Sequence, residues 1–329
     1  MHRQNAGITG TGHALGSEVI TNEHLAARLK VSEEWITSRT GIKERRCAAP
    51  DEYTSTLAVR ASLAACDAAN TDAADLDLII CTTVCPDYTQ MPATACLVQA
   101  ELGARRAAAF DLAAACSGFI YGLDVAQKFV ASGAYQNVLV VSSDLMTRFV
   151  DYDDPNTSIL FGDGAGAAIV SAVEKPRGIL AAHIASDGNL ADYIYTPAGG
   201  TRLSTSCETV RGKQQFMKMR GRELFKVAVA AMPQSSLQVL EQANLTLNDV
   251  DLVIPHQANQ RIIDAVAARL EIAPEKVFSN IERIGNTGAA TIPIALDQCL
   301  RSGRVKSGDT VLLTAFGGGI TWGSAIVKF

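Results

Sequence analysis

Charged and aromatic residues are scarce in this 329-residue chain. They make up 19% and 6% of it, whereas hydrophobic residues make up 48%. This composition excludes a disordered protein and suits a chain with large buried cores. The formal net charge of −5 gives no reason to expect a nucleic-acid partner. No apolar run approaches the roughly 18 residues that span a membrane, and Met1–Gly10 has no basic segment leading into an apolar stretch. We therefore expect a cytoplasmic protein without a membrane partner.

Patterns typical of metal ligands are also missing. Cys81 and Cys85 lie close together, but no second pair of Cys or His follows at the spacing of a zinc site. In a large cytoplasmic chain the eight cysteines should be reduced. Most of them are best interpreted as small buried hydrophobic residues. We expect no metal site, and a functional role for any one cysteine needs independent support.

The sequence contains an internal repeat. Strand and helix signals alternate throughout, which is typical of an α/β protein. Matched apolar segments recur in the same order in both halves: 75–80 with 249–254, 137–141 with 310–314, and 161–170 with 322–327. The length also suits two core-sized units. We predict a duplicated α/β protein with units at 1–173 and 174–329, divided where charge and proline interrupt the apolar pattern at 174–177.

Cys116 is the candidate nucleophile. It lies between an apolar strand at 108–112 and a helical stripe over 117–133. At such a turn, free backbone N–H groups and the helix dipole lower the pKa of a thiol. A thiolate both attacks thioesters and leaves from them, so cysteine suits reversible acyl transfer. On local sequence alone, a small core cysteine in an alanine-rich turn is an equal alternative.

His256 and Asn286 are its candidate partners. His256 ends a buried strand, at the edge where open α/β sheets bind ligands. Asn286 occupies the position that the repeat relates to Cys116. Taken singly, His256 is as easily structural and Asn286 as easily a turn residue. Together the three predict a site between the two halves. The triple glycine 317–319 allows close approach to a ligand and suits an oxyanion hole with the N–H of Cys116. The glycine-rich run 162–166 lacks the spacing of a dinucleotide-binding loop, and we interpret it as a tight interior turn.

These features resemble the 3-ketoacyl-[acyl-carrier-protein] synthase III family over residues 6–329. The matching pieces are 35–45 (WITSRTGIKER), the Cys116 turn, 161–168 (FGDGAGAA), 255–259 (PHQAN), 285–287 (GNT) and 316–319 (FGGG). The resemblance implies the thiolase-like fold, with two stacked α/β halves in a five-layered α-β-α-β-α arrangement, and a homodimer. It also implies an acyltransferase that needs no cofactor. Such an enzyme condenses an acyl-CoA primer with malonyl-ACP, with loss of carbon dioxide, to give the 3-ketoacyl-ACP that initiates fatty acid synthesis.

The resemblance also assigns roles to single residues. Cys116 would carry the acyl group, and its N–H and that of Gly318 would hold the oxyanion. His256 and Asn286 would bind the thioester carbonyl of malonyl-ACP and stabilise the enolate formed on decarboxylation. Phe316 would lie over the departing carboxylate. Neutral donors fit this role, because a full countercharge would trap the malonyl carboxylate.

The resemblance also implies residues that bind the substrate. Trp35 would stack on the adenine of CoA, with an inward-packed helix aromatic as the alternative, and Arg39 would reach the phosphates. Many members have an arginine facing the adenine where this chain has Pro155. This predicts weaker CoA binding or a different acyl donor. Met91 stands where the acyl pocket is often closed across the dimer, and its flexibility leaves the length of the primer open.

A basic patch is the expected docking site for the acidic acyl carrier protein. Its residues are Arg220, Arg222 and Lys226, with Arg261 and Arg269 on a following helix. Such a patch steers docking despite the negative net charge, although a solvated charged loop is the alternative.

Two other functions stay open at this level. One is a same-fold condensing enzyme or acyltransferase of a secondary-metabolite pathway, such as one that makes an alkylquinolone or a polyketide starter, which Pro155 and Met91 allow. The other is a catalytically silent thiolase-like partner subunit, against which intact Cys116, His256 and Asn286 argue. For the homodimer we expect an interface that includes residues 81–95.

Overall fold

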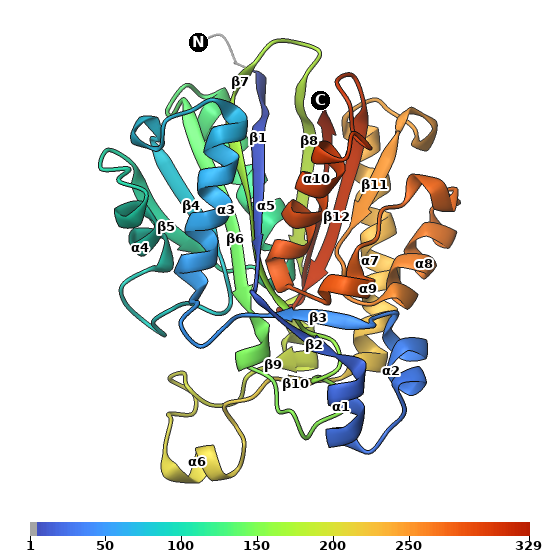
Figure 1. Cartoon of the computed structure of the whole chain (residues 1–329). Helices are drawn as coiled ribbons and strands as arrows, with labels where there is room; N and C mark the ends of the chain where they lie inside the picture. Colours follow the sequence, from blue (N-terminus) through green and yellow to red (C-terminus); the bar gives the residue numbers. More distant parts are fainter. Residues whose placement is uncertain (1–4) are drawn as a thin grey trace.

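The computed structural model describes residues 5–329 as two stacked β-sheets with helices between and outside them (Figure 1). The first sheet has the strand order β1-β7-β6-β4-β5 and the second the order β11-β12-β13-β8. The strands of the first sheet are β1 (Asn5–Leu15), β4 (Leu78–Thr82), β5 (Ala108–Leu112), β6 (Asn137–Leu145) and β7 (Asp163–Val173). Those of the second are β8 (Gly178–Ser186), β11 (Leu252–Pro255), β12 (Thr310–Gly317) and β13 (Thr321–Lys328).

The second sheet repeats the pairing of the first. β4 runs parallel to β6 as β11 does to β12, and the next two partners in each sheet are antiparallel. β4 and β11 are buried at every position, which explains their continuous apolar sequence. The predicted duplication is thus present in the fold. All strands of the first sheet precede residue 174 and all those of the second follow it, and we propose the boundary of the two units there.

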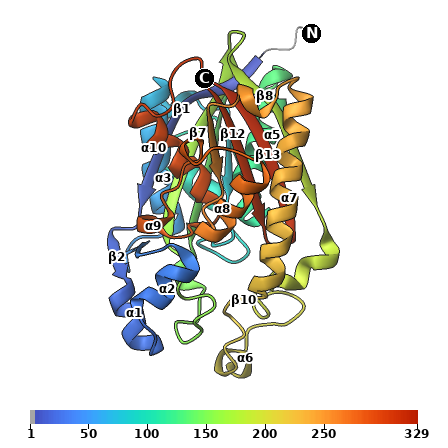
Figure 2. The ribbon, with the colours of Figure 1, turned by 90° about the vertical axis from the view of Figure 1, so that its right-hand side faces the viewer.

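Helices complete five layers. On the outer face of the first sheet lie α3 (Thr54–Ala69) and α4 (Thr94–Glu101), which share a core cluster with its strands. Between the sheets lie α5 (Gly118–Ala131) and α10 (Thr291–Arg301), in the one cluster that contains strands of both halves. On the outer face of the second sheet lie α7 (Gly221–Gln242) and α8 (Gln260–Arg269); Figure 2 shows the long helix α7 along this face. The arrangement is the predicted thiolase-like α-β-α-β-α fold.

Smaller elements gather at the lower end of the molecule in Figure 1. They are β2 (Glu18–Thr21), α1 (Asn22–Leu29), α2 (Glu33–Thr40), β3 (Glu44–Cys47), β9 (Ile194–Tyr195), α6 (Cys207–Arg211) and β10 (Lys218–Met219). Short 3₁₀ turns are η1 (Ala73–Asp75), η2 (Ala115–Ser117), η3 (Met146–Arg148), η4 (Gly188–Tyr193), η5 (Leu247–Asp249), η6 (Pro274–Lys276) and η7 (Gly288–Ala290), and α9 spans Ile281–Ile284. Within residues 5–329, no helix combines the length and apolar character needed to cross a membrane.

The glycine-rich run 162–166 differs from its sequence interpretation as a tight interior turn. From Asp163 onward it is strand β7, paired with β6 and β1. Its glycines make room for α10: a Cβ on Gly166 would lie 2.7 Å from the backbone nitrogen of Ile294. Close packing of a helix on a strand, and not a turn, explains this glycine pattern.

Candidate active site

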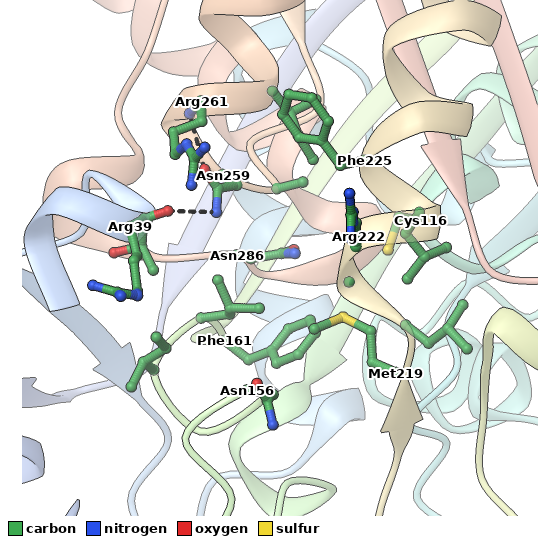
Figure 3. Close-up of a pocket in the computed structure, with 18 of the residues that line it drawn as sticks. Arg39, Cys116, Asn156, Phe161, Met219, Arg222, Phe225, Asn259, Arg261 and Asn286 are labelled. Atoms are coloured by element: carbon green, nitrogen blue, oxygen red, sulfur yellow. Dashed lines mark hydrogen bonds between the residues drawn. The ribbon is translucent and has the colours of Figure 1, made fainter. Parts of the chain in front are cut away.

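A cavity of about 670 Å³ opens between the two halves and the lower cap (Figure 3). Cys116, His256 and Asn286 all line it, although they come from different elements. The predicted Trp35, Arg39, Phe316, Gly318, Arg222, Lys226 and Arg261 line it as well. Three segments distant in sequence therefore bring one thiol, one imidazole and one amide to the same space.

The turn that carries Cys116 is held in an unusual conformation. Ala115 has φ of 47°, in the left-handed region that costs a residue with a Cβ about 1 kcal/mol or more. The β12–β13 turn secures it: Ser117 Oγ donates to the carbonyl of Thr321 at 3.1 Å, and Thr321 Oγ1 donates to that of Ala114 at 2.8 Å. Cys116 lies in η2, immediately before α5. The strain exposes the thiol to the cavity from a fixed backbone.

The electrostatics of the thiol correct one sequence expectation. Burial, with a smaller effect of the Asp144 carboxylate, raises the pKa of Cys116 to about 12. The sequence predicts a lowered pKa because it shows the helix terminus, but it does not show the depth of the site or the buried carboxylate. The sulfur is therefore a neutral thiol near pH 7.

His256 lies directly after β11 and is 1% exposed. Its Nδ1 lies 2.6 Å from Thr291 Oγ1 at the start of α10, and its backbone N–H donates to the carbonyl of Thr314 at 2.8 Å. Burial lowers the pKa of His256 to about 3, so the imidazole is neutral near pH 7. The ring centroid of Phe316 lies 6.3 Å from that of His256. A neutral imidazole between these contacts has one nitrogen, Nε2, left for a ligand.

Asn286 is fixed by its backbone and its side chain together. Its N–H donates to the carbonyl of Leu160 and its carbonyl accepts from Gly162, both at 2.9 Å. Its Oδ1 accepts from the backbone N–H of Gly288 at 2.9 Å. Since the amide oxygen is engaged, the Nδ2 group is the part of Asn286 that remains to donate into the cavity.

Asp144 supports this loop and was not predicted from the sequence. It is fully buried at the end of β6, where its carboxylate accepts from Thr83 Oγ1 and the backbone N–H groups of Val84 and Ala289 at 2.8–3.0 Å. Burial raises its pKa to about 6, against the opposing effect of these hydrogen bonds. The carboxylate therefore joins the first half to the Asn286 loop of the second.

The glycine loop 316–319 packs directly on the turn that carries Cys116. A Cβ on Gly317 would lie 2.6 Å from the backbone nitrogen of Cys116, which only glycine permits. Gly318 lies over Ala115, whose Cβ is 3.6 Å from the position of a Cβ on Gly318. The backbone of residues 316–318 thus forms one wall of the cavity beside the thiol.

The mouth of the cavity carries Trp35 and Arg39 on α2. Arg39 stacks on Trp35, with its guanidinium carbon 4.1 Å from the ring centroid. Asn259 joins this helix to the second half, because its Nδ2 donates to the carbonyl of Arg39 at 3.0 Å and its Oδ1 accepts from the N–H of Arg261 at 2.9 Å (Figure 3). Pro155 lines the same mouth. Trp35 is only partly buried, so it is not simply a core aromatic.

Cations line the cavity and acids do not. Arg39, Arg222, Lys226 and Arg261 are among the lining residues, and no Asp or Glu is. The other two predicted docking residues lie outside the lining and have partners of their own. Arg220 forms an ion pair with Asp192 at 2.7 Å. The guanidinium of Arg269 donates to the carbonyl of Val229 at 3.5 Å. This carbonyl lacks its usual donor four residues along α7, because residue 233 is a proline without an N–H.

Met91 lies away from the cavity of the single chain. It is 77% exposed, in the loop between β4 and α4. Sequence reasoning missed other lining residues, such as Phe225 and Met219, and the supporting contacts of Thr291. The apolar helical stripe at the start of α7 indicates that Phe225 is part of a buried face. Nothing in the sequence spacing indicates the contact of Thr291 with His256. Among the described residues, no cluster of His, Cys, Asp and Glu has the arrangement of a metal site.

Comparisons with known proteins agree with this geometry. The family model described as 3-oxoacyl-[acyl-carrier-protein (ACP)] synthase III matches residues 110–188, and that of the synthase III C terminal matches residues 240–329. The chain is 49% identical to beta-ketoacyl-[acyl-carrier-protein] synthase III of Caldanaerobacter subterraneus and 50% identical to that of a Roseiflexus species, over 98% of both chains in each case.

Solved structures show the same likeness. The 3-oxoacyl-[acyl-carrier-protein] synthase III of Aquifex aeolicus superposes with a TM-score of 0.91 at 46% identity, covering 98% of this chain and 100% of that one. The enzyme of Thermus thermophilus superposes with a TM-score of 0.91 at 41% identity, covering 98% and 99%. On these grounds the chain belongs to the 3-oxoacyl-[acyl-carrier-protein] synthase III family.

Proposed function

We propose that this protein condenses an acyl-CoA primer with malonyl-ACP, with loss of carbon dioxide, and so makes the 3-ketoacyl-ACP that initiates fatty acid synthesis. The observation that carries the proposal is the meeting of Cys116, His256 and Asn286 in one cavity with a cationic mouth. The family relationship makes the protein an acyltransferase of the condensing type. No specific observation favours the secondary-metabolite pathway or the silent subunit.

In the first half-reaction Cys116 carries the acyl group. Its sulfur attacks the thioester carbon of the primer, the bond between that carbon and the CoA sulfur breaks, and the thiol proton leaves on CoA. The N–H groups of Cys116 and Gly318 hold the oxyanion of this step. A neutral Cys116 thiol is consistent with this order, because deprotonation is coupled to departure of the basic CoA thiolate.

In the second half-reaction His256 and Asn286 act on malonyl-ACP. Both donate hydrogen bonds to its thioester carbonyl, and the electron pair released by loss of carbon dioxide is stabilised there as an enolate. The carbanion then attacks the acyl carbon, a carbon–carbon bond forms, the bond from that carbon to the Cys116 sulfur breaks, and the released thiolate takes up a proton from solvent. Supporting this, His256 is neutral and Asn286 has its amide N–H₂ free. The apolar ring of Phe316 beside His256 would favour loss of the charged carboxylate.

We propose that CoA enters past Trp35 and Arg39, and that it binds weakly. Arg39 covers one face of Trp35, and Pro155 lines the same mouth and carries no charge. Pro155→Arg should therefore lower the KM for acyl-CoA several-fold and leave kcat unchanged. An unchanged KM would show that Pro155 does not limit CoA binding.

For the carrier protein, the supporting observation is that Arg222, Lys226 and Arg261 lie around the mouth without an ion pair among residues 5–329. Charge reversal of each to Glu should raise the KM for malonyl-ACP, most strongly at low salt. Arg220→Glu is the matched control and should have a smaller effect, since Arg220 already has an acidic partner in Asp192. Equal effects of all four would point to general charge and not to docking.

We also propose a homodimer through the loop that follows β4. Val84, Tyr88 and Met91 are 40%, 56% and 77% exposed there, beside the edge strand β5. Exposed apolar side chains next to an open sheet edge favour association. Tyr88→Asp should yield monomers in sedimentation, whereas Leu237→Asp on the outer face of α7 should not. A monomeric wild type at micromolar concentration would contradict the proposal.

The condensation needs no cofactor, because every bond change uses groups of the substrates and of Cys116. We place the protein in the cytoplasm, where CoA esters are available and where its eight cysteines, free in the structure, stay reduced. The test of the function is direct. Wild type mixed with a panel of acyl-CoAs should gain one acyl mass, and malonyl-ACP should then release carbon dioxide and yield 3-ketoacyl-ACP. Absence of any acyl adduct would contradict the proposal.

A further inference from the structure

The contact between His256 and Thr291 indicates which of the two imidazole nitrogens carries the proton. Nδ1 and Oγ1 lie 2.6 Å apart, and the two residues are 1% and 2% exposed. The bond can be drawn in two directions. In one, Nδ1–H donates to the hydroxyl oxygen; in the other, the hydroxyl donates to an unprotonated Nδ1.

The hydrogen-bond partners of the Thr291 hydroxyl distinguish the two directions. Among the described residues, Thr291 Oγ1 has His256 as its one hydrogen-bond partner. If Nδ1 donated, the hydroxyl proton of Thr291 would be buried without an acceptor, which costs about 1–3 kcal/mol. If the hydroxyl donates, its proton is satisfied and the ring places its own proton on Nε2. The second arrangement leaves only the Nε2–H group of His256 to be satisfied, and His256 lines the cavity, where a ligand can accept from it, whereas Thr291 does not.

We propose that Thr291 is a positioning residue that fixes His256 as an Nε2–H donor facing the cavity. This inference rests on the proposed function, in which His256 stabilises the enolate. Burial supports it, because the pKa of His256 is lowered to about 3 and the ring carries a single proton to place. The same device orients Asn286, whose Oδ1 is held by the N–H of Gly288 so that its Nδ2 faces the ligand.

The protonated Nε2 has a chemical consequence. A nitrogen that already carries its proton donates to the developing oxyanion but does not accept the proton of the Cys116 thiol. Thr291 therefore selects one of two roles that an imidazole in this place offers. His256 acts in decarboxylation and is not the base that activates the nucleophile.

Two substitutions test the inference. Thr291→Val keeps the shape of the side chain and removes the hydroxyl, whereas Thr291→Ser keeps the hydroxyl. The valine variant should release carbon dioxide from malonyl-ACP about 10- to 100-fold more slowly, by analogy with the loss of other groups that orient a functional histidine. Its acylation by acyl-CoA should stay within a few-fold of wild type, and the serine variant should recover most of the decarboxylation. A merely structural role would slow both half-reactions together.

Nitrogen NMR of histidine-labelled wild type reads the tautomer without relying on activity. In wild type, the His256 signals, assigned by their loss in His256→Gln, should show a protonated Nε2 and an unprotonated Nδ1. A proton on Nδ1 would overturn the inference, as would a valine variant with wild-type decarboxylation. His256→Ala distinguishes the two levels. If His256→Ala decarboxylates malonyl-ACP at the wild-type rate, the proposed function of His256 is wrong. If His256→Ala loses decarboxylation and Thr291→Val keeps it, only the role of Thr291 is wrong.

Discussion

The two neighbouring glycines Gly317 and Gly318 should respond very differently to the same substitution. A Cβ on Gly317 would lie 2.6 Å from the backbone nitrogen of Cys116 and 3.0 Å from that of Ser117. The first distance is about 0.8 Å short of ordinary contact at 3.4 Å, and backbone atoms on a clamped turn cannot swing away. A Cβ on Gly318 would instead meet Ile194 Cγ2 at 3.2 Å, the end of a side chain that can shift.

Gly317→Ala should therefore displace the nucleophile. A misplacement approaching 1 Å at a reacting group costs on the order of 100-fold in rate. We expect acylation of Cys116 to fall by about that factor in Gly317→Ala and by less than about tenfold in Gly318→Ala, which keeps the backbone N–H that we propose for the oxyanion hole. Intact-protein mass against time after addition of acyl-CoA measures the rate, and circular dichroism checks the fold. Wild-type acylation by Gly317→Ala, or a larger loss in Gly318→Ala, would refute the reasoning.

Three further predictions concern the thiol, the imidazole and the Asn286 loop. Alkylation of Cys116 by iodoacetamide, corrected with Cys116→Ala, should rise about tenfold per pH unit from about pH 7 to 9, because its pKa is raised; a plateau near neutral pH would show a lowered pKa instead. For His256 the unfolded chain binds a proton between about pH 6.5 and 3 and the folded chain does not, so acid destabilises the fold. We compare the free energy of unfolding in urea between wild type and His256→Gln. The difference, wild type minus variant, should fall by up to about 1.4 kcal/mol per pH unit below pH 6.5, since the opposite effect of Asp144 is common to both proteins and cancels. A difference that does not change with pH would contradict a buried neutral ring. Gly288→Ala puts a Cβ at φ of 61° and 2.2 Å from Asp144 Oδ2, whereas Gly303→Ala has φ of 71° and open space. The first should cost about 2–4 kcal/mol in urea unfolding and the second about 1 kcal/mol, and equal costs would exclude the clash.

The fold was largely predictable because it repeats itself. The apolar runs that became β4 and β11 are continuous in sequence, since each strand is buried on both faces. A doubled pattern of this kind needs no knowledge of contacts. The interpretation of 162–166 as a turn was wrong because Gly164 and Gly166 allow the close packing of α10, which follows more than a hundred residues later in the sequence.

The candidate site was predictable in its members but not in its supports. Cys116, His256 and Asn286 stand at strand ends and turns, where local sequence indicates exposure to a ligand. Asp144 and Thr291 act through contacts with Ala289 and His256 that no spacing encodes. The predicted direction of the pKa shift of Cys116 was wrong for the same reason. A helix terminus is visible in sequence, whereas burial and the field of a carboxylate from another strand are not.

The central claim is the division of labour between Cys116, which carries the acyl group, and the pair His256 and Asn286, which stabilise the enolate. The most direct test measures both half-reactions in His256→Ala and Cys116→Ala, by intact-protein mass after acyl-CoA and by labelled carbon dioxide from malonyl-ACP. We expect His256→Ala to be acylated at an appreciable rate and to lose about 100- to 1,000-fold in decarboxylation. Cys116→Ala should lose acylation and keep some decarboxylation. If His256→Ala lost acylation as completely as Cys116→Ala, His256 would be the base for the thiol and the account would be contradicted.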